Sequence, residues 1–481
     1  MNEPILDRVF YHIYPLGAFG APRRNDGASA PEPRLRRALD WIPAMERVGA
    51  DALYLGPVFE SESHGYDTTD YLSVDRRLGT NADLADVSRA LSESGIGLYL
   101  DAVLNHVGRN HPFVRDVAER GRGSEYAGWI SGYDPSGPGP GGLPFRYDGW
   151  KGHYDLVRLD TGAPPVREYL IGVALRWIAE FGIAGLRLDA ADCLDRRFMA
   201  ELGAHCREAR PGFRLIGEVV HGDSYEPVLR EGGLDAVTDY EAYKGLWSSY
   251  NERNCHEIAW TLDRLFAEPP RGPAAAGTWP GAGLCRGRAL YSFADNHDVD
   301  RVAGVVRDPA GLYPLYALLF SMPGVPSVYY GSEYGVGGRK LGGDDGPLRP
   351  ELHPADLPSS GPHPDLAAAI GRFSAARRGS IAIRRGTYRR LAVAAEGLAF
   401  ERAYGGGDEG SERVIVAVNA SAAPMRFELP AGGPSDGPTR GDGSRGGRFA
   451  DLLDPAYRAE SIAGRIAIEV PPHWARWLRA V

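Results

Sequence analysis

Three acidic residues each close a short apolar run that reads as a β-strand. Asp189 ends the run 185–189, Glu218 ends 215–218, and Asp298 ends 291–298. Arg187 stands two residues before Asp189, so a strand would turn both side chains to the same face. Two carboxylates that face each other across a sugar are the minimum for glycoside hydrolysis, one as nucleophile and the other as acid/base. A third acid and an arginine suit a transition state in which the sugar ring becomes positive.

The two main carboxylates need different protonation states in such a reaction. We expect Arg187 to keep Asp189 ionised, as a nucleophile must be. Glu218 must instead begin protonated, so its surroundings should raise its affinity for a proton. His106 and His297 also follow apolar runs and could hydrogen-bond sugar hydroxyls, although a single histidine at such a place is more often structural.

The acids are separated by helix-length connections, and one architecture brings them together. In a parallel βα barrel all strands end at the same face, and the active site lies there. The sequence supplies eight candidate strands, at 9–15, 52–59, 96–106, 185–189, 215–218, 236–240, 291–298 and 324–333. Helical spacing is found at 35–48, 82–94, 166–181, 196–209 and 365–378. We therefore predict an α/β fold, a (β/α)8 TIM barrel.

Two segments depart from this rhythm. Residues 107–158 include a Gly- and Pro-rich stretch and predict a small subdomain inserted after the third strand. After residue 385 short alternating runs predict a C-terminal antiparallel β domain, a β-sandwich, over 386–481, with a loop at 432–447. The barrel itself is assigned to 1–106 and 159–385. Aromatic residues of the insertion are candidates for a sugar groove, although packing is the commoner role: Trp129, Trp150 and Tyr154.

Composition narrows the functional classes. The 481 residues carry a net charge of −9, which argues against a nucleic-acid or anionic-membrane partner. No segment approaches a membrane span, and the N-terminus has no signal-peptide pattern. Four cysteines stand without metal-site spacing and are read as reduced thiols. We expect a cytoplasmic protein.

Six short motifs carry a family resemblance. Residues 101–106 (DAVLNH), 185–189 (GLRLD), 217–219 (GEV) and 293–298 (FADNHD) resemble, in order, four conserved regions of the α-amylase family of glycoside hydrolases. Residues 65–71 (GYDTTDY) and 324–333 (GVPSVYYGSE) resemble two more. The resemblance spans most of the chain up to residue 333, and it implies the barrel, the insertion and hydrolysis with retention through a glycosyl-enzyme.

The resemblance also implies roles. Asp189 is similar to the family nucleophile, Glu218 to its acid/base, and Asp298 to its third carboxylate, with Asp189 and Glu218 about 5–5.5 Å apart. The positions similar to substrate-binding or supporting residues are Tyr66, Asp101, His106, Arg187, His297 and Arg301. Tyr66 would stack on the sugar that His106 and His297 bind, and Arg187 would orient the nucleophile beside Asp101.

Departures from the family pattern bear on the substrate. Asp192 and Cys193 stand where many α-amylases have a Lys-His pair, so ordinary starch digestion is not implied. Asp192 could equally cap the next helix. The stretches 54–60 and 217–221 look most like the cyclomaltodextrinase, neopullulanase and maltogenic amylase branch. That branch usually has an N-terminal β domain used in dimerisation, absent from this sequence, so monomer and homodimer both stay open. We predict no cofactor and no required metal, although some relatives bind calcium near Asn105.

The sequence thus predicts retaining hydrolysis of α-glucosidic bonds in short or cyclic maltooligosaccharides, mainly α-1,4 bonds, with α-1,6 bonds as a second candidate. Cyclodextrins and cyclic maltosyl-maltose are the candidate ring substrates. A transglycosylase or isomerase would share every catalytic residue and differ in how well it excludes water. An inactive sugar-binding protein on the same scaffold is the alternative from another class, and it would typically have lost one of the three carboxylates.

Overall fold

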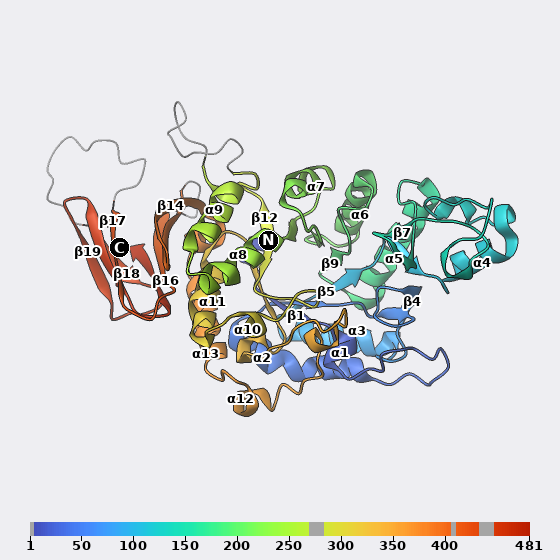
Figure 1. Cartoon of the computed structure of the whole chain (residues 1–481), viewed down its shortest axis with the longest axis horizontal. Helices are drawn as coiled ribbons and strands as arrows, with labels where there is room; N and C mark the ends of the chain where they lie inside the picture. Colours follow the sequence, from blue (N-terminus) through green and yellow to red (C-terminus); the bar gives the residue numbers. More distant parts are fainter. Residues whose placement is uncertain (1–3, 269–282, 406–409, 432–446) are drawn as a thin grey trace.

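The core of the molecule is a closed barrel of eight parallel strands (Figure 1). The computed structural model describes residues 4–268, 283–405, 410–431 and 447–481. The barrel strands are β1 (Phe10–Ile13), β2 (Ala52–Leu55), β5 (Gly97–Ala102), β9 (Gly185–Leu188), β10 (Arg214–Gly217), β11 (Ala236–Thr238), β12 (Ala289–Phe293) and β13 (Val325–Tyr329). They pair in chain order around the barrel, and β13 closes it against β1. The predicted TIM barrel is confirmed.

The barrel strands are apolar on both faces, because helices cover the outside and side chains fill the inside. The inner cluster is largely aromatic: Phe10 packs edge-to-face on Tyr99, with ring centroids 4.7 Å apart, and on Tyr291, at 5.2 Å. Outside, the larger core lies between strands and helices and includes the buried Trp41 and Trp177. This double packing holds the strand ends, and hence the acids that follow them, in a fixed register.

Helices link the strands. The longer ones are α2 (Ile42–Val48), α3 (Asn81–Glu93), α5 (Pro164–Phe181), α6 (Arg196–Ala209), α7 (Tyr225–Glu231), α8 (Tyr240–Asn251), α9 (Cys255–Phe266), α11 (Leu312–Ser321) and α13 (Leu366–Arg378). Short helices are α1 (Pro15–Ala18), α10 (Val302–Val305), α12 (Leu357–Ser360) and α14 (Ile381–Arg385).

Local signals explain where these helices begin and end. Helix α5 starts at Pro164, whose missing N–H costs nothing at the first position, and it stops at Gly182, which has a left-handed φ of 60°. The predicted helix over 35–48 is divided. It begins as a 3-10 helix, Arg34–Trp41, and becomes α2 only at Ile42. Pro43 explains the break, because proline is tolerated in the first turn of an α-helix but not in its interior.

The insertion after the third barrel strand contains helix α4 (Pro112–Arg120) and the three-stranded sheet β6–β8–β7. Its strands are β6 (His106–Gly108), β7 (Gly149–Trp150) and β8 (His153–Arg158). A separate hairpin, β3 (Phe59–Ser61) with β4 (Thr68–Val74), follows the second barrel strand. The insertion lies at one end of the molecule and the C-terminal sheet at the other (Figure 1).

The C-terminal part is an antiparallel sheet in the order β14–β15–β16–β21–β18–β19–β20–β17. These strands are β14 (Thr387–Ala394), β15 (Gly397–Tyr404), β16 (Glu412–Asn419), β17 (Met425–Pro430), β18 (Arg448–Asp451), β19 (Arg458–Ile462), β20 (Arg465–Val470) and β21 (Trp474–Ala480). Its inward residues, Phe427 and Ile468 among them, form a core of their own.

Arg402 ties this sheet to the barrel, because it donates to the carbonyl of Ser321 at 2.7 Å. The C-terminal β domain is thus confirmed, while the limits given for the three domains stay predictions. The predicted loop at 432–447 lies, except for its last residue, outside the described residues. Within the described ranges no helix is both long and apolar enough to cross a bilayer.

Candidate active site

The three predicted catalytic acids open onto one cavity of about 1070 Å³. Asp189 directly follows β9, Glu218 directly follows β10, and Asp298 follows β12 by five residues. All three line the cavity, together with Tyr66 and His106. The strand-end argument therefore accounts for the three acids and His106, and Tyr66, which only the family resemblance indicated, lies on the same surface.

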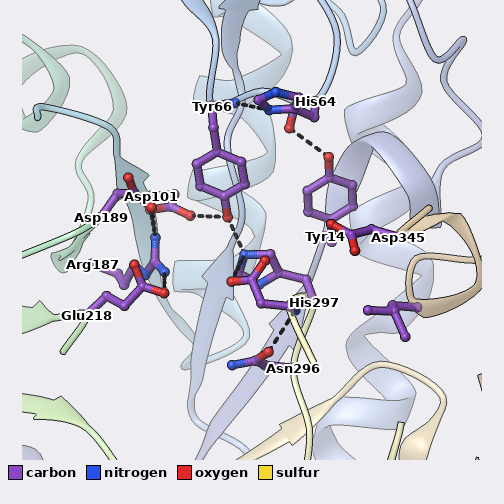
Figure 2. A network of polar contacts seen from close by, with 12 residues as sticks. Tyr14, His64, Tyr66, Asp101, Arg187, Asp189, Glu218, Asn296, His297 and Asp345 are labelled. Atoms are coloured by element: carbon purple, nitrogen blue, oxygen red, sulfur yellow. Dashed lines mark hydrogen bonds and ion pairs between the residues drawn. The ribbon is translucent and has the colours of Figure 1, made fainter. Parts of the chain in front are cut away.

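Arg187 joins the acids beneath that surface (Figure 2). Its guanidinium lies 2.8 Å from a carboxylate oxygen of Asp101, of Asp189 and of Glu218. The arginine is 4% exposed, so these contacts are shielded from solvent. One cation held by three carboxylates fixes the orientation of both Asp189 and Glu218, as expected for a pair that must act from two sides of one bond.

The backbone after β9 contributes to the same geometry. Ala190 has a φ of 46°, a left-handed conformation that costs a non-glycine residue about 1 kcal/mol or more. In this conformation its N–H donates to Oε2 of Glu218 at 3.0 Å. Tyr240, at the start of α8, donates its hydroxyl to Oε1 of the same carboxylate at 3.3 Å. Glu218 is therefore held by backbone, arginine and tyrosine together.

The charge balance differs from the expectation drawn for Asp189. Burial raises the pKa of Asp189 well above its ordinary value, Arg187 opposes this, and the charges of Glu218 and Asp101 add to it. The idea that Arg187 alone keeps Asp189 ionised is therefore incomplete, because the same guanidinium is shared by three acids.

The second part of the site is built around His297. Its ring lies parallel to Tyr66, with centroids 5.6 Å apart, and Tyr66 Oη hydrogen-bonds to its Nε2. The same Nε2 lies 3.0 Å from Oδ2 of Asp298. Burial disfavours the charge on Asp298, but His297, Arg349 and Arg187 hold its pKa below the ordinary value. Asp298 is therefore ionised wherever the protein is folded at moderate pH.

His106 stands on the other side, with Nε2 3.9 Å from Oδ2 of Asp189. Burial lowers the pKa of His106 to about 3, so the ring is neutral near pH 7. A neutral imidazole has one donor and one acceptor, and Asn105 Nδ2 contacts its Nδ1 at 3.1 Å. Its Nε2 is buried without a hydrogen-bond partner beside the cavity, which suits a hydrogen bond to a ligand hydroxyl.

Arg349 is a site residue that the sequence did not reveal. It donates to Oδ1 of Asp298 at 3.1 Å, to Oδ2 of Asp345 at 3.1 Å and to the carbonyl of His297 at 2.9 Å. Its guanidinium lies over the ring of Tyr14, 4.5 Å from the centroid. Arg349 belongs to an irregular loop after β13, where no periodic pattern marks it. Tyr240 was more accessible to sequence reasoning, because it ends the sixth predicted strand.

Arg301 is not where the resemblance implied. It is 0% exposed and donates to the carbonyls of Leu348 and Tyr330, at 3.1 and 2.9 Å. Its guanidinium stacks over Tyr329 and Tyr330. Arg301 therefore holds the loops behind the cavity instead of binding substrate, and Arg349 supplies the cation beside Asp298.

Asp192 lines the cavity and does not cap a helix. The cap of α6 is Asp195, whose carboxylate accepts from the N–H of Phe198 at 2.9 Å. Asp192 instead lies 3.7 Å from Nζ of Lys151, at the tip of the β7–β8 hairpin. Trp150 beside it also lines the cavity. Of the other aromatic candidates, Trp129 packs against Phe113 and Tyr126 of the insertion and Tyr169 of helix α5, and Tyr154 is 45% exposed.

Within the described ranges, no group of three or more His, Cys, Asp or Glu side chains is arranged to hold a metal ion. Asn105, near which some relatives bind calcium, contacts His106, and burial raises the pKa of the Cys193 thiol to about 11. A thiol with that pKa is a poor ligand at neutral pH, because the thiolate is the ligand.

Comparison with known proteins agrees with this geometry. The profile described as the catalytic domain of alpha amylase matches residues 37–357. A cyclomaltodextrinase of a Bacillus species is 28% identical over 356 residues, 69% of this chain and 60% of the relative. An intracellular maltogenic amylase of Bacillus subtilis (strain 168) is 30% identical over 309 residues, 63% of this chain and 49% of the relative. The chain thus spans 60% or less of the length of these two curated relatives.

A solved structure matches over nearly the whole chain. The ligand-free cyclic α-maltosyl-(1→6)-maltose hydrolase of Arthrobacter globiformis superposes with a TM-score of 0.74 and 27% identity, and the match covers 99% of each chain. The resemblance read from the six short motifs thus extends to the full fold, including the insertion and the C-terminal sheet.

Proposed function

Because the chain belongs to the α-amylase family, we propose that it is a retaining glycoside hydrolase that cleaves α-glucosidic bonds in short or cyclic maltooligosaccharides. The observation that carries the proposal is the shared cavity of Asp189, Glu218 and Asp298, with Arg187 bound to the first two. The α-1,4 bond is the main target and the α-1,6 bond a second one.

Asp189 and Glu218 have different roles in the reaction. A carboxylate oxygen of Asp189 attacks the anomeric carbon while Glu218 gives its proton to the leaving glycosidic oxygen, so the carbon–oxygen bond breaks and a glycosyl–Asp189 ester forms. Glu218 then takes a proton from a water molecule, whose oxygen attacks the same carbon and releases Asp189. Two inversions leave the anomeric configuration unchanged.

The surrounding groups act on the sugar that becomes positively charged. Asp298 is ionised and faces the cavity, so it accepts hydrogen bonds from ring hydroxyls and favours the developing positive charge. The neutral ring of His106 hydrogen-bonds a hydroxyl on the nucleophile side. Tyr66, whose hydroxyl is fixed by Asp101 at 3.1 Å, offers its ring as the stacking surface.

The size of the substrate follows from the cavity. At about 1070 Å³ it is at the upper end of small-ligand pockets, which are about 300–1,000 Å³. It therefore takes an oligosaccharide rather than one sugar. Trp150 and Lys151 of the β7–β8 hairpin line the cavity, where Lys151 lies 3.7 Å from Asp192. We take this hairpin to favour short or cyclic chains over long ones. Relatives named for cyclic substrates support that choice.

We place the enzyme in the cytoplasm, with a small oligosaccharide as its ligand. The four cysteines are free thiols, as is usual where the environment is reducing, and one relative is named as intracellular.

The deciding experiment is chromatography of the products formed from linear, branched and cyclic α-glucans, with Glu218→Gln as the inactive control. Fast opening of cyclodextrins with slow attack on amylose supports the proposal, and NMR of the first product should show the α-anomer. Longer or rearranged sugars would make the protein a transglycosylase or isomerase. No turnover of any α-glucan would refute hydrolysis, as would full activity of Asp189→Asn.

A further inference from the structure

A second cavity of about 630 Å³ adjoins the catalytic one. Helix α8, the loop after β12 and the loop after β13 form its walls. Asp298, Val299 and Lys340 line both cavities. A ligand bound at Asp298 therefore lies beside the second cavity as well.

The face of α8 that borders the cavities is a row of aromatic rings. Tyr240, Tyr243 and Trp247 follow each other at intervals of three and four residues, which places them on one side of the helix. Tyr240 lines the catalytic cavity and contacts Glu218, whereas Tyr243 and Trp247 line the second cavity. The ring centroids are 6.5 Å apart for the first pair and 6.4 Å apart for the second.

The aromatic row on α8 packs against the end of barrel strand β12. Tyr243 stacks on Phe293 at the end of β12, with ring centroids 5.6 Å apart and planes at 27°. The aromatic surface is thus fixed by the barrel itself, and it leads outward from the acid/base. Flat, rigid rings of this kind are suited to the apolar faces of sugar rings, because little conformational freedom is lost when a ligand binds.

The opposite wall is polar and rigid. The backbone N–H of Lys340 donates to Oδ1 of Asp300 at 2.8 Å, which joins the two loops. Two of the cations here already have acidic partners: Lys340 lies 3.0 Å from Asp345, and Arg307 lies 2.8 Å from Glu252. Asp298 and Asp300 line the same cavity as these cations. The wall therefore offers hydrogen-bonding groups, and its positive charges are largely balanced by negative ones. Such a wall fits a neutral, hydroxyl-rich ligand better than an anion.

We propose that the second cavity is a further carbohydrate subsite, which binds α-glucosyl units of the same substrate that lie beyond the catalytic cavity, with Trp247 as their stacking surface. The inference rests on the proposed function, since it takes the ligand of the adjoining cavity to be an α-glucan. Its consequence is a preference for substrates with enough units, or a ring wide enough, to reach both cavities.

The test compares a short and a long substrate. KM is measured for maltotriose and for maltoheptaose with wild-type protein, Trp247→Ala and Trp260→Ala. Trp260, on the neighbouring helix α9, is 44% exposed to solvent and serves as the matched control. We expect Trp247→Ala to raise the ratio of KM for maltoheptaose to KM for maltotriose about tenfold, the effect of losing one well-placed aromatic contact. Trp260→Ala should leave the ratio as in wild type.

Thermal unfolding of both variants shows whether either change harms the fold. If Trp247→Ala does not fold, Arg339→Ala on the opposite wall is used, with the same increase in ratio expected. An unchanged ratio in a folded variant overturns the subsite, even when both substrates are cleaved. Failure of wild-type protein to cleave either substrate counts against the proposed function instead, so the two proposals fail in different ways.

Discussion

Replacing Arg349 by methionine tests whether the cation beside Asp298 contributes to catalysis. The arginine side chain is 11% exposed and is shared between Asp298 and Asp345. A hydrogen bond to a charged group that is shielded from water contributes about 1.5–3 kcal/mol. Loss of the bond to Asp298 should therefore lower kcat/KM on a maltooligosaccharide about 10- to 150-fold. Part of the effect should be on kcat, because Asp298 is expected to act most strongly on the charged transition state.

Two further variants sharpen this experiment. Arg349→Lys keeps the charge but loses the planar fork that reaches two carboxylates, so it should fall between wild type and Arg349→Met. Arg230→Met removes an ion pair of the same length outside the cavity, with Glu226 at 3.1 Å, whose arginine side chain is 58% exposed. That variant should lose less than about fivefold. The reasoning is refuted if Arg349→Met unfolds at the wild-type temperature and keeps kcat/KM within threefold of wild type.

Three other predictions use the same assays. Lys151 Nζ lies 3.7 Å from Oδ2 of Asp192, and the lysine side chain is about half exposed to solvent. A double-mutant cycle with alanine at both positions should therefore give a coupling free energy of unfolding below about 1 kcal/mol. The same variants should change KM for cyclic substrates more than kcat. His106 has its pKa lowered to about 3 and is charged in the unfolded chain below about pH 6.5. It therefore destabilises the fold as pH falls through that window, and His106→Gln should show a smaller drop in melting temperature between pH 7 and pH 4. Arg301→Met should lower the unfolding free energy, measured by urea unfolding, by about 1–3 kcal/mol or more, the cost of a buried acceptor without its donor, because Arg301 donates to the carbonyls of Leu348 and Tyr330. An unchanged unfolding free energy with a raised KM would instead support substrate binding by Arg301.

The strand-end acids could be predicted from the sequence because their position follows from one simple rule. A short apolar run fixes the strand, and in a parallel barrel every strand end lies at the same face. Asp189 and Glu218 therefore needed only the two runs before them. The rule also indicated His106, whereas Tyr66 lies between β3 and β4 and was indicated only by the family resemblance.

Residues in irregular loops could not be found in this way. Arg349 lies beyond β13 in a stretch without periodicity, and its partners Asp298 and Asp345 are known only once the loop is folded. Asp192 was considered as a cap of the next helix, but the cap is Asp195, three residues later. A shift of this size is within the uncertainty of a helix start predicted from sequence. Arg301 shows the reverse case, because the resemblance implied a substrate-binding residue, whereas the side chain is fully buried and donates to the carbonyls of Leu348 and Tyr330.

The charges of the site explain why it needs so rigid a frame. Asp101, Asp189, Glu218 and Asp298 are four carboxylates, and their direct arginine partners are only Arg187 and Arg349 among the contacts described above. A buried site with more acids than cations repels itself, and this repulsion costs folding free energy. The same excess becomes favourable when a sugar ring between the acids turns positive, because fixed negative charge stabilises that state without reorganising. Closed packing of aromatic side chains inside the barrel holds the acids together in the absence of substrate, and a looser scaffold would relieve the repulsion by moving them apart.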